Sequence, residues 1–142
     1  MAITKQSIDV VAFESLQVGQ LLPSYTKPPI TKVQLVKYAG ASGDFNPLHT
    51  DDAFAQKIGM QGVIAHGMLV MGLLGEYVMM LAGDVAQVKQ FSMRFGAMTL
   101  PGDAITCIAQ VKEIHEGEVV FELTAQKQDQ TVVGSGKATL SF

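Results

Sequence analysis

The sequence predicts an α+β fold in which an antiparallel five-stranded sheet wraps around one long central helix, with short helices before it. Three observations predict this architecture. The stretch Gly67–Ala82 is apolar except for Glu76, and so long an apolar run is typical of a buried helix. From Val88 onward, apolar and polar residues alternate as they do in strands. Short turns separate these strands, and short connections imply antiparallel pairing.

Length and composition favour one folded domain. The chain has 142 residues, of which 48% are hydrophobic and 16% are charged. We expect a single domain over residues 13–142, preceded by an N-terminal arm over residues 1–12 that shows no clear period. A composition this apolar also indicates that a partner subunit covers part of the surface.

The first elements carry recognisable boundary signals. Residues 21–30 contain β-forming residues, but three prolines restrict them to an edge strand or an extended run. Thr31 and Gln34 fit a capping box for a short helix that reaches about Ala41.

A second short helix is expected between residues 50 and 59. Thr50 is suited to cap it, and Gly59 is suited to end it. Asp51 and Asp52 then fall in its first turn, where the helix dipole favours negative charge, and we interpret them as helix-start charges.

The long helix is expected to begin near His66 or Gly67 and to run to about Ala82. It is apolar almost all the way round, so we expect it to be enclosed on every side. Glycine is unfavourable inside a helix, and close approach of other backbones would explain its three glycines, Gly67, Gly72 and Gly75.

The alternating segments that follow are KQFSMRF, DAITCIAQVKEI, EVVFELTAQKQ and TVVGSGKATLSF. Turns are expected at Leu100–Asp103, Glu116–Gly117 and Asp129–Gln130. Cys107, the only cysteine, lies in the second segment and is expected to be a buried core thiol.

Charge and hydropathy exclude several classes of function. The net charge is −3, and Arg94 is the only arginine, so no basic stripe exists that would bind nucleic acid. The N-terminus lacks the apolar region of a signal peptide, and the apolar helix is too short to cross a membrane. We therefore expect a soluble cytoplasmic protein. The sequence also has no cluster of metal ligands and no glycine-rich phosphate loop, so we expect neither a metal nor another cofactor.

The segment Gly43–His49 is the main candidate for chemistry. Asp44 and His49 lie five positions apart across a turn stiffened by Pro47, and a carboxylate beside an imidazole can polarise a water. Asn46 adds an amide that can orient a substrate. The alternative is that Asp44 only caps backbone amides of the turn. We expect neither catalytic side chain to belong to the apolar core.

The start of the long helix is the second candidate. Backbone N–H groups there lack helical partners and carry partial positive charge, and Gly67 would let a substrate oxygen approach them. Alternatively, Gly67 only permits tight packing. We interpret His66 as a structural residue of the helix start, and His115 as a solvated residue of a charged turn.

Together, these segments resemble a known family. The run from Tyr38 to His49, YAGASGDFNPLH, resembles the signature of the MaoC-like, (R)-specific enoyl-CoA hydratases, and AHGM at Ala65–Met68 follows at a similar spacing. The resemblance implies a hot-dog fold, with Asp44 and His49 as the catalytic pair. It also implies that Asn46 binds substrate and that the amide of Gly67 is the oxyanion donor.

The implied reaction is water addition to a trans-2-enoyl thioester, giving an (R)-3-hydroxyacyl thioester, on coenzyme A or acyl carrier protein. The resemblance also implies a dimer: a homodimer, or a heterodimer with a second hot-dog subunit. The nearest alternative is the dehydration direction on acyl carrier protein in fatty-acid synthesis. A hot-dog thioesterase, with Glu76 as its carboxylate, and a non-catalytic acyl-thioester binding module are further alternatives. No motif sets the acyl length.

Overall fold

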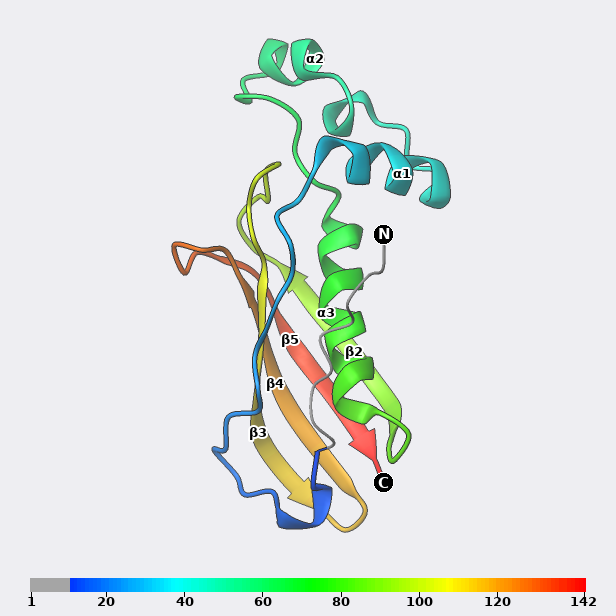
Figure 1. The fold of residues 1–142 in the computed structure, drawn as a ribbon, viewed down its shortest axis with the longest axis vertical. Helices are drawn as coiled ribbons and strands as arrows, with labels where there is room; N and C mark the ends of the chain where they lie inside the picture. The colour runs from blue at the N-terminus through cyan, green and yellow to red at the C-terminus, as the bar shows by residue number, and fades with distance from the viewer. Residues whose placement is uncertain (1–10) are drawn as a thin grey trace.

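The computed structural model describes residues 11–142. Its sheet has the strand order β1-β3-β4-β5-β2, and every neighbouring pair is antiparallel. The strands are β1 (Tyr25–Thr26), β2 (Gln87–Phe95), β3 (Thr106–His115), β4 (Glu118–Gln126) and β5 (Val132–Ser141). The long helix α3 (Gly67–Ala82) lies along one face of the sheet, with shorter helices beyond its N-terminal end (Figure 1). The predicted fold class is confirmed.

The chain before α3 follows the sequence signals closely. A single 3₁₀ turn, η1 (Phe13–Ser15), comes first, and β1 pairs with β3 at one edge of the sheet, as the prolines predict. Helix α1 (Lys32–Ser42) begins with the predicted capping box, in which the Gln34 N–H donates to Thr31 Oγ1 at 3.0 Å. It ends at Gly43, whose φ of 76° suits glycine.

The cap of the second helix corrects the prediction. Helix α2 (Asp52–Lys57) is capped by Asp51, whose Oδ1 accepts from the N–H groups of Ala53 at 3.0 Å and Phe54 at 3.3 Å. Thr50 instead closes the preceding 3₁₀ turn η2 (Pro47–His49), donating its N–H to the Pro47 carbonyl. A turn residue cannot also adopt the extended conformation of a helix cap, so the helix starts one residue later.

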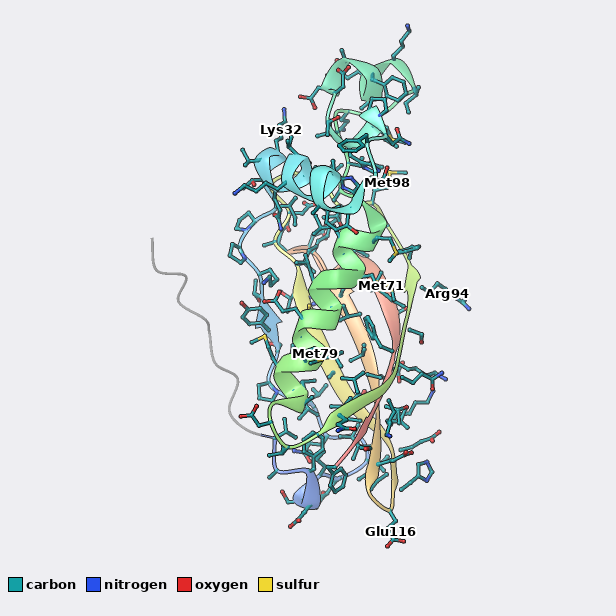
Figure 2. All side chains as sticks on the ribbon, turned by 90° about the vertical axis from the view of Figure 1, so that its right-hand side faces the viewer. Lys32, Met71, Met79, Arg94, Met98 and Glu116 are labelled. Carbon is teal, nitrogen blue, oxygen red and sulfur yellow. The ribbon has the colours of Figure 1, made fainter. Side chains whose placement is uncertain are left out.

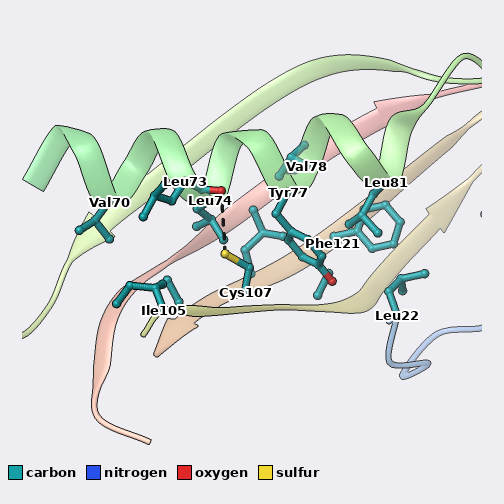
Figure 3. Close-up of a cluster of buried hydrophobic side chains, with 14 of the residues drawn as sticks. Leu22, Val70, Leu73, Leu74, Tyr77, Val78, Leu81, Ile105, Cys107 and Phe121 are labelled. Atoms are coloured by element: carbon teal, nitrogen blue, oxygen red, sulfur yellow. Dashed lines mark hydrogen bonds between the residues drawn. The ribbon is translucent and has the colours of Figure 1, made fainter. Parts of the chain in front are cut away.

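The hydrophobic core lies between α3 and the sheet (Figure 3). Its helical part is Leu69, Val70, Leu73, Leu74, Tyr77, Val78, Leu81 and Ala82. Cys107 is buried as predicted, and its Sγ donates to the Leu73 carbonyl at 3.9 Å. Burial raises the pKa of the Cys107 thiol to about 12.

The other face of α3 is exposed in the single chain, so the sheet of one subunit does not enclose the helix on every side. Met68 and Met79 are 56% and 61% exposed, and Gly72 is exposed between them. Figure 2 labels Met71 and Met79 along this helix. Because the sequence is apolar on all sides, its periodicity does not distinguish the face that meets the sheet from the face that does not.

The glycines of α3 also differ from the prediction. A Cβ at Gly67 would lie 3.1 Å from the ring of Phe95, and one at Gly75 would lie 3.3 Å from the ring of Phe91. No atom lies within 4 Å of such a Cβ at Gly72. Aromatic side chains of β2, rather than other backbones, therefore approach this helix.

The turn before β3 is held by a buried carboxylate. Asp103 Oδ2 accepts from the Leu100 N–H at 2.7 Å and lies 3.0 Å from Lys127 Nζ, and the Gln128 amide donates to Oδ1 at 3.0 Å. Burial opposes ionisation, but these three donors together hold the pKa of Asp103 below its usual value.

Of the predicted N-terminal arm, residues 1–10 lie outside the described residues, and Val11 packs in the core. The domain boundary at residue 13 therefore stays a prediction. No helix within residues 11–142 is long and apolar enough to cross a membrane.

Candidate active site

The Asp44 loop is shaped by its own side chains. Asp44 Oδ1 accepts from the Asn46 N–H at 3.2 Å, and Asn46 Oδ1 accepts from the Leu48 N–H at 3.0 Å. Asn46 is thereby the cap of η2. Asp44 therefore caps a backbone amide of the turn, as the alternative interpretation expected, but it does so with Oδ1 alone. Its other oxygen, Oδ2, remains available for another role.

His49 is buried, although it is not part of the hydrophobic core cluster. Its residue is 9% exposed, and its Nδ1–H donates to the Ile64 carbonyl at 2.7 Å. The backbone completes this link, because the Ile64 N–H donates to the Leu48 carbonyl at 3.2 Å. The segment before α3 therefore fixes the tautomer of His49 and leaves Nε2 with a free lone pair.

Asp44 and His49 converge, as the sequence predicted. His49 Nε2 lies 3.8 Å from Asp44 Oδ2, and the Asp44 side chain is half-exposed. That separation is too long for a direct hydrogen bond. A water about 2.8 Å from both atoms would have an angle of about 85° between its two bonds, so one water can donate to both acceptors.

The N-terminus of α3 lies beside this pair. Its cap residue, His66, makes no side-chain bond to the helix amides, whereas Thr31 and Asp51 cap α1 and α2 within the described part of the chain. A cavity of about 180 Å³ is lined by His49, Gly67, Val70, Phe95 and Thr99, among others. Two larger surface hollows, of about 450 and 460 Å³, border neither His49 nor Gly67.

His66 is the residue that the sequence interpretation undervalued. The residue is 1% exposed, and its ring stacks on the ring of His49, with 3.8 Å between centroids and 24° between planes. Its Nε2–H donates to the Asp44 carbonyl at 3.3 Å. Burial lowers the pKa of His66, the bond to Asp44 opposes this change, and the His49 ring adds to it. The sequence signal for this role was the position of His66 directly before Gly67 in the AHGM segment.

The remaining predicted residues have structural partners. Asp52 does more than mark a helix start: it pairs with Lys32 of α1, and its Oδ1 accepts from the Val63 N–H at 3.0 Å. His115 is exposed beside Glu113, as expected.

Ligand atoms of Asp44, His49 and His66 lie within 4.8 Å of one another, a spacing that a metal ion can use. Two stacked rings, however, hold their in-plane lone pairs in separate planes, so both cannot bind one ion without unstacking. This geometry does not support a metal centre.

Comparisons with known proteins identify the family. A family model described as "MaoC like domain" matches residues 16–133. The chain belongs to this family.

Proteins similar in sequence include an enoyl-CoA hydratase and fatty acid synthase beta subunits. An (R)-specific enoyl-CoA hydratase of Aeromonas caviae is 32% identical over 121 residues, which cover 80% of this chain and 84% of that protein. A fatty acid synthase beta subunit of Cochliobolus carbonum is 33% identical over 107 residues, 72% of this chain. The MaoC-like chain spans only 5% of the length of that beta subunit.

Solved structures agree with the predicted hot-dog fold. The (R)-hydratase from A. caviae involved in PHA biosynthesis has a TM-score of 0.81 and 27% identity, over 91% of this chain and 98% of that one. An R-hydratase from Pseudomonas aeruginosa has a TM-score of 0.82 and 29% identity, over 91% of this chain and 83% of that one. These relatives are (R)-hydratases, the class that the sequence predicts. No comparison tests the individual roles of Asp44, Asn46, His49 and Gly67, which stay predictions.

Proposed function

We propose that this MaoC-like protein is a hydro-lyase that interconverts trans-2-enoyl thioesters and (R)-3-hydroxyacyl thioesters. The observation that supports it most directly is the 3.8 Å gap between His49 Nε2 and Asp44 Oδ2, beside an uncapped helix N-terminus. Water activation and thioester polarisation need these two features side by side. The (R)-specific relatives support the stereochemistry.

The water is held by two acceptors in this proposal. His49 donates through Nδ1 to Ile64, so its Nε2 accepts one water hydrogen while Asp44 Oδ2 accepts the other. Both lone pairs of the water oxygen then remain available to attack C3 of the enoyl group. One of the two acceptors takes a proton from the water as the O–C3 bond forms, and the same group then gives this proton to C2 on the same side of the former double bond, which returns the enzyme to its starting state.

Charge builds on the thioester oxygen during this step. The Gly67 N–H at the start of α3 would donate to that oxygen, assisted by the partial positive charge of the helix terminus. Asn46 is proposed to contact the substrate through its amide NH₂, because its Oδ1 already accepts from Leu48. No step of this mechanism requires a metal or a redox cofactor.

The substrate carrier is either coenzyme A or acyl carrier protein. The chain has a net charge of −3, and its sequence shows no basic patch of the kind that an acidic carrier protein would bind. We therefore favour coenzyme A esters. The match to fungal fatty acid synthase beta subunits supports the dehydration direction on a carrier protein as the second candidate.

A thioesterase is less well supported, because its candidate carboxylate is engaged elsewhere. Glu76 Oε2 lies 2.7 Å from Lys27 Nζ. Glu76 is nine positions along the helix from Gly67, about 13.5 Å at a rise of about 1.5 Å per residue. A pure binding module would not need the carboxylate and imidazole acceptors that face each other in the Asp44 loop.

We also propose that two copies associate through β2 and the exposed face of α3. Among the strands of residues 11–142, β2 is the outermost at its end of the sheet, and no described strand pairs with its outer edge. Exposed Met68 and Met79 lie on the adjacent helix. A two-fold axis would pair β2 with its copy and join the two sheets. A heterodimer with a second hot-dog subunit would use the same surface. A cytoplasmic location stays the expectation from the sequence.

Two measurements test these proposals. Loss of the ultraviolet absorption of crotonyl-CoA, with chiral analysis of the product, tests the reaction; no hydration of crotonyl-CoA or crotonyl-carrier protein would refute it. Light scattering tests the dimer, which should have twice the 15.2 kDa chain mass. Met79→Lys should dissociate it, whereas the control Val18→Lys, at another exposed apolar residue, should not.

A further inference from the structure

His66 is a buried polar residue that the mechanism above leaves without a role. Its residue is 1% exposed, and within residues 11–142 only two buried side-chain polar atoms lack a hydrogen-bond partner, His66 Nδ1 and Thr99 Oγ1. An apolar side chain would pack in the same place without an unpaired nitrogen. His66 is the cap residue of α3 but does not bond the helix amides, so capping does not explain it either.

One edge of the His66 ring holds the backbone of the Asp44 loop. Its Nε2–H donates to the Asp44 carbonyl at 3.3 Å, across 22 residues of sequence. The loop that bears the Asp44 carboxylate is exposed to solvent, and the Asp44 side chain itself bonds only within the loop, where it accepts from the Asn46 N–H. This bond therefore ties the loop to the fixed start of α3.

One face of the same ring supports His49. The bond from His49 Nδ1 to the Ile64 carbonyl restrains the imidazole at one ring atom. Stacking on His66, with 3.8 Å between centroids and 24° between planes, restrains the plane of the ring, whose Nε2 lies 3.8 Å from Asp44 Oδ2. His66 is itself held by the ring of Tyr38 in α1, which meets it edge to face at 4.7 Å.

We propose that His66 is a positioning residue, which sets the distance between Asp44 Oδ2 and His49 Nε2 by holding the loop of the one and the ring of the other. This inference rests on the proposed hydratase function, because that distance matters where the two groups share a water. His66 also directly precedes Gly67, so one residue connects both acceptors to the proposed oxyanion donor. Burial lowers the pKa of His66, which favours the neutral form of its ring beside the two acceptors.

Three substitutions separate the two contacts of His66. His66→Phe keeps the aromatic stack but cannot donate to Asp44. His66→Gln can donate but cannot stack, and His66→Ala loses both. The matched control is His115→Ala, which removes an exposed histidine from the end of β3.

The first readout is kcat and KM for crotonyl-CoA, measured below the melting temperature of each variant and corrected for the folded fraction. His66→Ala should lower kcat about 10²-fold, the usual cost of misplacing reacting groups by about 1 Å, with KM changed less than about threefold. The Phe and Gln variants should fall between His66→Ala and wild type, and His115→Ala should match wild type. A purely structural His66 would lower the melting temperature and leave kcat intact.

The second readout does not depend on activity. Nitrogen NMR of the His49 ring should show the Nδ1–H tautomer that Ile64 fixes in both proteins, and in His66→Ala the Nε2 resonance should shift and broaden because the ring no longer holds one orientation. Unchanged His49 nitrogen shifts, a kcat within twofold of wild type, or a loss confined to KM would each overturn the inference. If the wild type hydrates neither thioester, the proposed function fails and the NMR result alone decides the role of His66. Should His66→Ala not fold, the Phe and Gln variants decide by the same criteria.

Discussion

Gly67→Ala should separate catalysis from folding. A Cβ at Gly67 would lie 3.1 and 3.2 Å from Cε1 and Cδ1 of the Phe95 ring. Phe95 is 55% exposed, so its ring can move outward by the few tenths of an ångström needed. Alanine also improves helix propensity, by up to about 1 kcal/mol in a helix interior and by less at its first position. We therefore expect the unfolding free energy to change by less than about 1 kcal/mol.

The effect on catalysis should be much larger. Gly67 and Phe95 line the same cavity, so the added methyl group fills the space through which a thioester oxygen would reach the Gly67 N–H. Loss of one oxyanion donor typically lowers kcat about 10²–10³-fold, or about 2.7–4 kcal/mol of transition-state stabilisation. The assay is crotonyl-CoA hydration, with urea unfolding of the same samples.

Gly40→Ala is the matched control. Gly40 lies in α1 and is exposed, and no atom lies within 4 Å of the position that its new methyl group would take. Both the activity and the stability of this variant should therefore stay at or above wild type. The reasoning is refuted if Gly67→Ala retains kcat within about threefold, or if it loses activity only in proportion to unfolding.

Three further predictions test other parts of the structure. Asp44→Asn and His49→Gln should each lower kcat about 10²–10⁴-fold, and the double mutant should be little worse than the poorer single mutant, because the two groups act on one water; additive losses would contradict this. Because the folded-state pKa of Asp103 lies below its unfolded value, its carboxylate stabilises the fold above about pH 4 and stops doing so as pH falls through the folded pKa. Asp103→Asn should therefore lower the urea midpoint, relative to wild type, more at pH 7 than at pH 3. An equal decrease at the two pH values would argue against the bonds to Leu100 and Lys127. The thiol of Cys107, with its pKa raised to about 12 by burial, should resist iodoacetamide at pH 8 until the protein unfolds, which mass spectrometry of the alkylated chain can follow.

The sequence by itself determined the features that depend on near neighbours in the chain. The capping box at Thr31 and Gln34, the end of α1 at Gly43 and the strands after Val88 follow from hydrogen bonds or alternation over a few residues. Asp44 and His49 could be paired because only five positions and a proline-stiffened turn separate them, so their side chains had little freedom to diverge. Even here, the choice between Thr50 and Asp51 as a cap depended on the turn that Thr50 had already completed.

Tertiary structure decided what depends on where distant segments meet. His66 contacts Asp44 across 22 residues, and its stack on His49 exists only because the start of α3 lies under the loop. A histidine at a helix start has the same local pattern whether it caps, packs or positions a neighbour. The exposed side of α3 was equally undetermined, since a helix that is apolar all round packs on the sheet with whichever face the strands leave for it. Contact between elements depends on their relative placement, and local sequence patterns do not encode that placement.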